Sequence, residues 1–210
     1  MVFRVSLLAA IVTFSLIAPV GADNVVEITK KNPESGKFGA QTRYDGSATK
    51  SFLLDKSPTA ESRYIAVWNF YLDTISRNFS IESGDRHEIL AALENGGRKI
   101  VRVFLGRNGK GTYYCMLRVK HDTGSVSVGR VSLKTDRWQR ITIDWQASSG
   151  PGIDDGFASI RKNNAVPKLV TNLDNDEHLI DRQELGAVSG VDPKTRGIVY
   201  FDNFISRRSP

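Results

Sequence analysis

Apolar and polar residues alternate along much of the chain after residue 60. In the clearest run, Thr112–Lys120, every second residue is large or apolar: Tyr113, Cys115, Leu117 and Val119. A period of two places successive side chains on opposite faces of a β-strand, so one face of such a strand is expected in a core. Similar runs predict further strands at Tyr64–Leu72, Lys99–Leu105, Trp138–Trp145, Gly156–Arg161, Leu185–Val188 and Gly197–Ile205.

Turn signals separate these runs. Arg107–Gly111 contains two glycines, and Asn163-Asn164 suits a tight turn because Asn tolerates positive φ. Gly129-Arg130 falls where the alternation changes phase, which predicts a β-bulge. Arg86–Leu93 fits a short helix or a strand equally well. Many short strands with turns about every ten residues are typical of an all-β, two-sheet antiparallel sandwich or jelly roll.

The first 22 residues differ from the rest of the chain. An apolar run, Val5–Val20, follows Arg4 and ends in the small-residue pattern Val20-Gly21-Ala22. These are features of a cleavable signal peptide, and the run is shorter than the roughly 20 residues of a membrane span. We therefore expect a signal peptide at 1–22 and a single β-sandwich domain at 23–210, secreted or periplasmic and without stable membrane insertion. An uncleaved N-terminal anchor is the alternative.

Charge and cysteine content add two constraints. The formal net charge is +6, and loss of Arg4 with the signal peptide makes it +5 (28 Lys and Arg minus 23 Asp and Glu). The basic residues are scattered, which argues against a nucleic-acid partner and is compatible with an acidic glycan. The single cysteine, Cys115, permits no internal disulfide, so an apolar core must supply the stability. We expect Cys115 to be a buried hydrophobe and not a nucleophile.

The order of these motifs is similar to that of a known superfamily. A first aromatic strand is followed by a hairpin around Gly109 and then by Trp138–Trp145, Leu185–Val188 and Gly197–Arg208. Together they resemble the concanavalin A-like lectin/glucanase superfamily, in the laminin-G-like form found in exported bacterial proteins. The resemblance implies two antiparallel sheets, one of them concave, in a protein that binds glycans, binds proteins or cleaves polysaccharides. The fold alone does not choose among these functions.

Catalytic motifs of this superfamily are incomplete in the chain. Glycanases of this fold carry the pattern Glu-x-Asp-x-x-Glu, which places two carboxylates on one strand face about 5 Å apart; the chain does not contain it. Arg182-Gln-Glu-Leu185 loosely matches one element of a polysaccharide lyase, but no Gln-x-His follows it. No catalytic residue is therefore assigned, and a polysaccharide lyase or glycoside hydrolase is the least favoured of three functions.

Calcium is the one ion for which the sequence offers ligands. Asp174, Asp176 and Glu177 form an oxygen-rich loop, although it lacks the glycine of an EF-hand; a solvated acidic loop is the alternative. Asp202 lies inside an aromatic strand, where a carboxylate must be paired or bound. A hydrogen bond to a turn in the N-terminal segment would satisfy Asp202 as well as a metal would.

The strand period also predicts a ligand-binding face. In Lys99–Leu105, a core that takes Val101, Val103 and Leu105 leaves Ile100, Arg102 and Phe104 on the other face. The same reasoning in two more strands predicts one surface made of Asn69, Tyr71, Arg102, Phe104, Tyr114 and Arg118. Aromatic rings stack on sugars, and arginine binds carboxylate or sulfate through two hydrogen bonds.

These residues favour a carbohydrate-binding or surface-recognition module whose ligand is a polysaccharide, with an acidic one as the best match. Ordinary cross-strand pairs on an exposed sheet would have the same composition. A structural or protein-interaction domain of the cell envelope is therefore the alternative function.

Export is directly testable. The intact mass of the exported protein should correspond to a chain that begins at Asp23, because the Val20-Gly21-Ala22 pattern directs cleavage after Ala22. A full-length species retained in the membrane fraction would show that the segment is an anchor.

Overall fold

The computed structural model describes residues 24–56 and 59–207, which form thirteen β-strands. The strands are β1 (Val25–Thr29), β2 (Gly39–Asp45), β3 (Ser51–Asp55), β4 (Arg63–Asp73), β5 (Arg86–Leu93), β6 (Lys99–Arg107), β7 (Tyr113–His121), β8 (Gly124–Ser132), β9 (Gln139–Gln146), β10 (Gly156–Lys162), β11 (Lys168–Leu173), β12 (Arg182–Ser189) and β13 (Arg196–Arg207). Within these ranges no helix has the length and apolar character needed to cross a membrane. The expected signal peptide at 1–22 lies outside the described residues.

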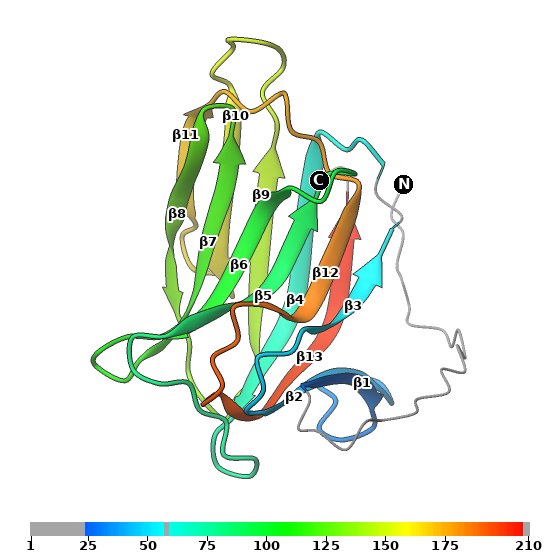
Figure 1. The fold of residues 1–210 in the computed structure, drawn as a ribbon, viewed down its shortest axis with the longest axis vertical. Helices are drawn as coiled ribbons and strands as arrows, with labels where there is room; N and C mark the ends of the chain where they lie inside the picture. Colours follow the sequence, from blue (N-terminus) through cyan, green and yellow to red (C-terminus); the bar gives the residue numbers. More distant parts are fainter. Residues whose placement is uncertain (1–23, 57–58, 208–210) are drawn as a thin grey trace.

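The strands form two antiparallel sheets stacked as a sandwich (Figure 1). The seven-stranded sheet has the order β1-β2-β13-β4-β9-β10-β11, and the six-stranded sheet has the order β3-β12-β5-β6-β7-β8. The six-stranded sheet lies in front in Figure 1. This arrangement confirms the all-β, two-sheet antiparallel sandwich that the turn spacing predicted.

The core lies between the inner faces of the two sheets. From the seven-stranded sheet, Phe70 and Leu72 of β4 and Trp145 of β9 are each 0 % exposed. From the six-stranded sheet, β6 and β7 contribute the alternating residues of the sequence pattern: Val101, Val103, Leu105, Tyr113, Cys115, Leu117 and Val119. Burial of one large aliphatic side chain stabilises the fold by about 1.5–3 kcal/mol, so the alternation fixes which face of each strand turns inward.

Cys115 is part of this core, as expected. It is 0 % exposed, and burial raises the pKa of its thiol. A thiol that stays protonated and covered by apolar neighbours packs as a small hydrophobe.

The ambiguous segment 86–93 is a strand. β5 pairs with β12 on one side and β6 on the other, so both edges of its backbone are hydrogen-bonded. His87 and Leu90 are 1 % and 0 % exposed, which shows that the segment is covered as a central strand is. Pairing with two neighbours, and not local propensity, decides its conformation.

Ile100 is not on the outer face, contrary to the prediction from strict alternation. It is 0 % exposed and belongs to the core. The pairing of β5 with β6 passes from Ala92↔Val101 to Leu93↔Lys99, which leaves Ile100 as an extra residue. A bulge of this kind shifts the phase of the alternation, so the period of two begins after Ile100.

The other local turn predictions fit the structure. The pairing of β7 with β8 passes from Leu117↔Gly129 to Arg118↔Ser127, so a bulge lies beside the predicted Gly129-Arg130 position. Asn163 has a φ of 52°, the left-handed conformation expected for the turn between β10 and β11.

One glycine close to the start of β13 is required for two separate reasons. Gly197 has a φ of 93°, and a Cβ there would lie 2.4 Å from Cα of Phe79. We expect Gly197→Ala to lower the free energy of unfolding by about 3 kcal/mol, because backbone atoms cannot move aside as a flexible side chain would. Urea unfolding measures this loss.

Gly190 provides the matched control. Its φ is 70°, but no atom lies within 4 Å of the Cβ position. Gly190→Ala should therefore show only the strain of positive φ, about 1 kcal/mol. Equal losses in the two variants would mean that the contact with Phe79 does not matter.

Candidate functional site

The outer face of the six-stranded sheet brings together most of the predicted ligand-binding residues. In one row of paired residues, Phe104 of β6 lies opposite Met116 of β7, which lies opposite Arg130 of β8. In the next row, Arg102 of β6 lies opposite Arg118 of β7. Directly opposed residues have Cβ atoms about 5 Å apart, so each row is a set of neighbouring side chains.

Three side chains on this face form an apolar cluster separate from the core: Phe104, Tyr114 and Met116. Tyr114 lies opposite Gly106, and a Cβ at Gly106 would be 2.6 Å from the Cζ and Oη atoms of Tyr114. Glycine at this position of β6 lets the tyrosine ring pack directly on the backbone of the neighbouring strand.

Arginines from three strands cover these aromatic rings. The Cζ atoms of Arg102 and Arg86 lie 4.9 Å and 5.4 Å from the ring centre of Phe104. The Cζ atom of Arg130 lies 4.7 Å from the ring centre of Tyr114. A guanidinium group near a ring gains cation–π attraction and keeps N–H donors for a planar anion.

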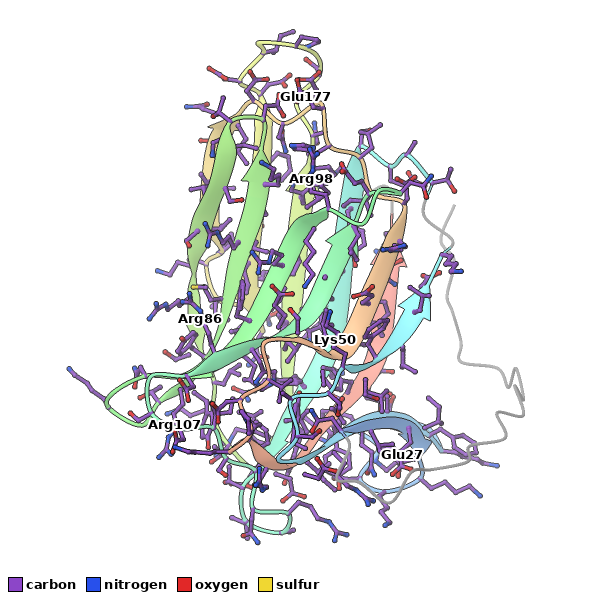
Figure 2. The ribbon with its side chains drawn as sticks, in the orientation of Figure 1. Glu27, Lys50, Arg86, Arg98, Arg107 and Glu177 are labelled. Carbon is purple, nitrogen blue, oxygen red and sulfur yellow. The ribbon has the colours of Figure 1, made fainter. Side chains whose placement is uncertain are left out.

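We call the following set the arginine–aromatic face: Arg86, Arg102, Phe104, Tyr114, Met116, Arg118 and Arg130. Arg86, which is labelled in Figure 2, is the first residue of β5.

Glu88 of β5 is the acidic partner beneath this face. It is 1 % exposed, and its carboxylate forms ion pairs with Lys99 and Arg102. The Ser189 hydroxyl also donates to it, at 2.7 Å. Burial alone would raise the pKa of Glu88, but hydrogen bonds from Lys99, Ser189 and Arg102 outweigh burial and lower it. The carboxylate is therefore ionised and fully engaged near neutral pH.

Arg118 differs from Arg102 in having no such partner. Its Nε atom is buried without a hydrogen-bond partner, and no ion pair of the described residues includes its guanidinium group. Two like charges placed directly opposite each other in a sheet repel. Glu88 offsets the charge of Arg102, while the charge of Arg118 remains available to an anion.

The structure separates two predicted residues from the others. Asn69 and Tyr71 lie on β4, in the seven-stranded sheet, whereas β6 and β7 lie in the six-stranded sheet. The Asn69 amide donates to the Glu34 carboxylate. The ring of Tyr71 packs 5.4 Å from that of Trp138. The single surface predicted from three strands is therefore wrong for β4, because alternation assigns a face to a strand but does not assign the strand to a sheet.

Three members of the arginine–aromatic face did not figure in the sequence prediction of the site. Arg86 lies on β5, which was ambiguous between helix and strand, and Arg130 lies beside the bulge of β8. Met116 has no charge or ring that would single it out. The available signal was the spacing of Arg86 and Glu88, which share one face of β5 once it is taken as a strand.

A histidine and a tyrosine also meet inside the sandwich. Nε2 of His87 lies 2.9 Å from Oη of Tyr44, and both side chains are buried. Burial lowers the pKa of His87 to about 3 and raises the pKa of Tyr44. The histidine is neutral and closed off from solvent, so this pair serves the core and not a substrate.

The predicted metal ligands lie in two different places. Asp174 and Asp176 follow β11 and are close to Asp122 at the end of β7. Asp202 of β13 is not part of that group, and its carboxylate accepts hydrogen bonds from the backbone N–H of Glu34 at 2.8 Å and Ser35 at 3.0 Å. For Asp202 the structure thus has the N-terminal hydrogen bonds that were the alternative to a metal.

Similarity to known proteins is found at the level of structure. Neither a protein-family model nor a curated protein sequence matches the chain. Cellulose-induced protein Cip1 is similar with a TM-score of 0.61 and 14 % identity, over 89 % of this chain and 86 % of that one. Alginate lyase Aly36B has a TM-score of 0.56 and 12 % identity over 82 % of each chain. Alginate lyase vAL-1 from Chlorella virus has a TM-score of 0.51 and 16 % identity, over 83 % of this chain and 77 % of that one.

These similarities and the sheet order define the class of the domain: it is a concanavalin A-like jelly roll. At such low identity the similarity shows the fold alone. Function must come from the site that this chain itself presents.

The Glu88 network predicts a specific pH dependence. Near pH 7, Glu88→Gln should lower the free energy of unfolding by about 2 kcal/mol, because charged hydrogen bonds become neutral ones. The folded-state pKa of Glu88 is below its ordinary value of 4.5, so this stabilisation is present above pH 4.5 and is lost as the pH falls through the folded pKa. The difference between parent and variant should therefore shrink in acid.

Glu184 supplies the control for this measurement. It lies on β12, faces the same side as Arg102 through the row Glu184↔Ala91↔Arg102, and is half-buried. No ion pair of the described residues includes it, so Glu184→Gln should change stability little at any pH. Denaturant unfolding at several pH values compares the variants, and a Glu88→Gln difference that widens in acid would contradict the assignment.

Proposed function

We propose that the protein is an exported carbohydrate-binding protein whose arginine–aromatic face recognises an acidic polysaccharide. The observation that carries this proposal is the unpaired guanidinium group of Arg118 directly opposite Arg102, beside the Phe104, Tyr114 and Met116 cluster. A carboxylate or sulfate bound between the two arginines would neutralise their repulsion and accept paired hydrogen bonds. Phe104, Tyr114 and Met116 are only 8 %, 6 % and 4 % exposed, so the aromatic cluster supports the guanidinium groups that cover it, and the arginines form the surface that a ligand would meet.

The same geometry supports binding over cleavage. A general acid or base must reach the bond that it acts on and exchange a proton there. Glu88, the carboxylate that contacts these arginines, is 1 % exposed and held by three donors. It is suited to positioning Arg102, and it is poorly placed for proton transfer to a sugar.

Alginate is a suitable first probe. It is a chain of carboxylated sugars, and two of the solved structures with the same fold are alginate lyases. Isothermal titration of the mature protein should show binding to alginate oligosaccharides and none to a neutral glucan such as dextran. Binding should weaken with added salt, because the attraction is between exposed charges.

Arg118→Ala is the decisive variant. It should raise the Kd for alginate about tenfold, equivalent to about 1.4 kcal/mol, because one charge-assisted contact is lost. Its free energy of unfolding should change by no more than about 0.5 kcal/mol, since Arg118 has no protein partner to lose. The Kd of Arg118→Lys should lie between that of the parent and that of Arg118→Ala, because lysine keeps the charge but lacks the planar guanidinium group.

Arg161→Ala is the control for net charge. Arg161 is an exposed residue of β10, in the other sheet. Its removal changes the net charge by the same amount and should leave the Kd unchanged. The proposal fails if Arg161→Ala weakens binding as much as Arg118→Ala, or if the parent binds no acidic glycan. Release of unsaturated uronate from alginate would identify a lyase instead.

A further inference from the structure

A second cluster of charged residues lies at the end of the sandwich where β7 and β11 finish. The β7–β8 turn and the β11–β12 connection meet there, and the backbone N–H of Asp122 donates to the carbonyl of Asp174 at 3.0 Å. Glu177, which belongs to this connection, is labelled at the upper end of the molecule in Figure 2. Carboxylate oxygens of Asp122, Asp174 and Asp176 all lie within 4.8 Å of one another.

Among the described residues, His178 is the one basic side chain in contact with these carboxylates. In the described part of the chain, no lysine or arginine forms an ion pair with any of the three. The Oδ1 atoms of Asp122, Asp174 and Asp176 are buried and have no hydrogen-bond partner. Buried acceptors without donors are otherwise uncommon in folded proteins.

His178 is the independent sign that the cluster holds a ligand. Its side chain is 1 % exposed, and neither ring nitrogen has a hydrogen-bond partner. Nε2 lies 4.0 Å from Oδ1 of Asp122, and a ligand atom of His178 falls within 4.8 Å of those of Asp122 and Glu177. A buried imidazole without hydrogen bonds is unfavourable unless something else binds it.

The other ring nitrogen of His178, Nδ1, lies near a carboxylate. Nδ1 of His178 lies 3.5 Å from Oε2 of Glu94, in the loop between β5 and β6. A histidine that binds a metal through one nitrogen commonly directs its other N–H toward a carboxylate, which fixes the tautomer and the ring orientation. Glu94 is placed to do this while Nε2 points toward Asp122.

The β11–β12 connection, which carries Asp174, Asp176, Glu177 and His178, is anchored to the sandwich. Asn175, between Asp174 and Asp176, is 0 % exposed. Its backbone N–H donates to Oγ of Ser148 at 2.9 Å, and its side-chain oxygen accepts the N–H of Ser148 at 2.8 Å. The two flanking aspartates are therefore held in place without help from a ligand.

We propose that a divalent cation binds at Asp122, which belongs to both groups of ligand atoms: Asp174 and Asp176 form one group with it, and Glu177 and His178 form the other, with Glu94 as a positioning residue for His178. Carboxylate oxygens bind Ca²⁺ and Mn²⁺ well, whereas an imidazole nitrogen favours a transition metal over Ca²⁺. The mixed ligand set therefore selects Mn²⁺ over Ca²⁺. This site is separate from the arginine–aromatic face, and neither proposal depends on the other.

Mn²⁺ itself is the probe for this site. Loss of the electron paramagnetic resonance signal of free Mn²⁺ should show one tight site per mature chain, and Ca²⁺ should displace it only at higher concentration. Asp174→Asn and His178→Gln should each weaken Mn²⁺ binding at least tenfold. His178→Gln should also abolish the preference for Mn²⁺ over Ca²⁺, because the nitrogen ligand is lost. Glu94→Gln should weaken Mn²⁺ binding about tenfold, as expected for a residue that orients a ligand.

Another acidic group on the surface provides the matched control. Glu82, Asp85 and Asp192 also have oxygens within 4.8 Å of one another, but Lys194 lies 2.9 Å from Glu82 and supplies a positive charge. Asp85→Asn should leave Mn²⁺ binding unchanged. Circular dichroism checks that every variant is folded, which is expected because Asp→Asn keeps the shape and removes repulsion. The proposal is overturned if the parent binds no Mn²⁺, if Asp85→Asn weakens binding as much as Asp174→Asn, or if Ca²⁺ binds as tightly as Mn²⁺.

Discussion

The packing of two apolar inner sheet faces against each other determines the rest of this structure. Leu105 and Leu117 of one sheet and Phe70 and Trp145 of the other share one buried core only if their strands keep the register that buries every second residue. A slip of one residue would exchange all inner and outer side chains of a strand. The same burial that stabilises the fold therefore fixes the positions of Arg102, Phe104 and Arg118 on the outside.

On the outer face, Arg102 and Arg118 lie opposite each other and repel, and the stability supplied by the core offsets this cost. Glu88 offsets the positive charge of Lys99 and Arg102 from below, and Ser189 contributes a further hydrogen bond. Arg118 receives no such help. Stability alone would favour a neutral residue at that position, because opposed like charges are unfavourable and the strand is already held by its pairing with β6 and β8. Arg86 and Arg130 likewise form no ion pair among the described residues, so three of the four arginines of this face keep an uncompensated charge, which supports the proposed anionic ligand.

The sequence predicted the parts of this structure that depend on period and turn chemistry. The buried faces of β6 and β7 and the left-handed turn at Asn163 follow from alternation and from what Asn tolerates. The bulge at Ile100 and the strand at 86–93 did not follow, because both depend on which strands lie alongside. For the same reason, the sequence did not predict that Asn69 and Tyr71 lie in the other sheet, away from their predicted partners. Alternation tells which face a side chain occupies, and only the tertiary fold tells which sheet the strand joins.

Placement of residues from distant parts of the sequence matters still more at the proposed cation site. Asp174 and Asp176 stand out in the sequence as a loop of acidic residues, but Asp122 and Glu94 come from other loops and gain their meaning only from proximity. β7 connects the two sites: Arg118 lies within it, and Asp122 follows its last residue, His121. β7 is paired along both edges, so its backbone holds Arg118 at a fixed position, and an extended anionic chain bound there as proposed would cost the freedom of the side chain but little of the backbone. For such a surface, affinity depends less on the area covered than on how firmly the sheet holds its arginines in register.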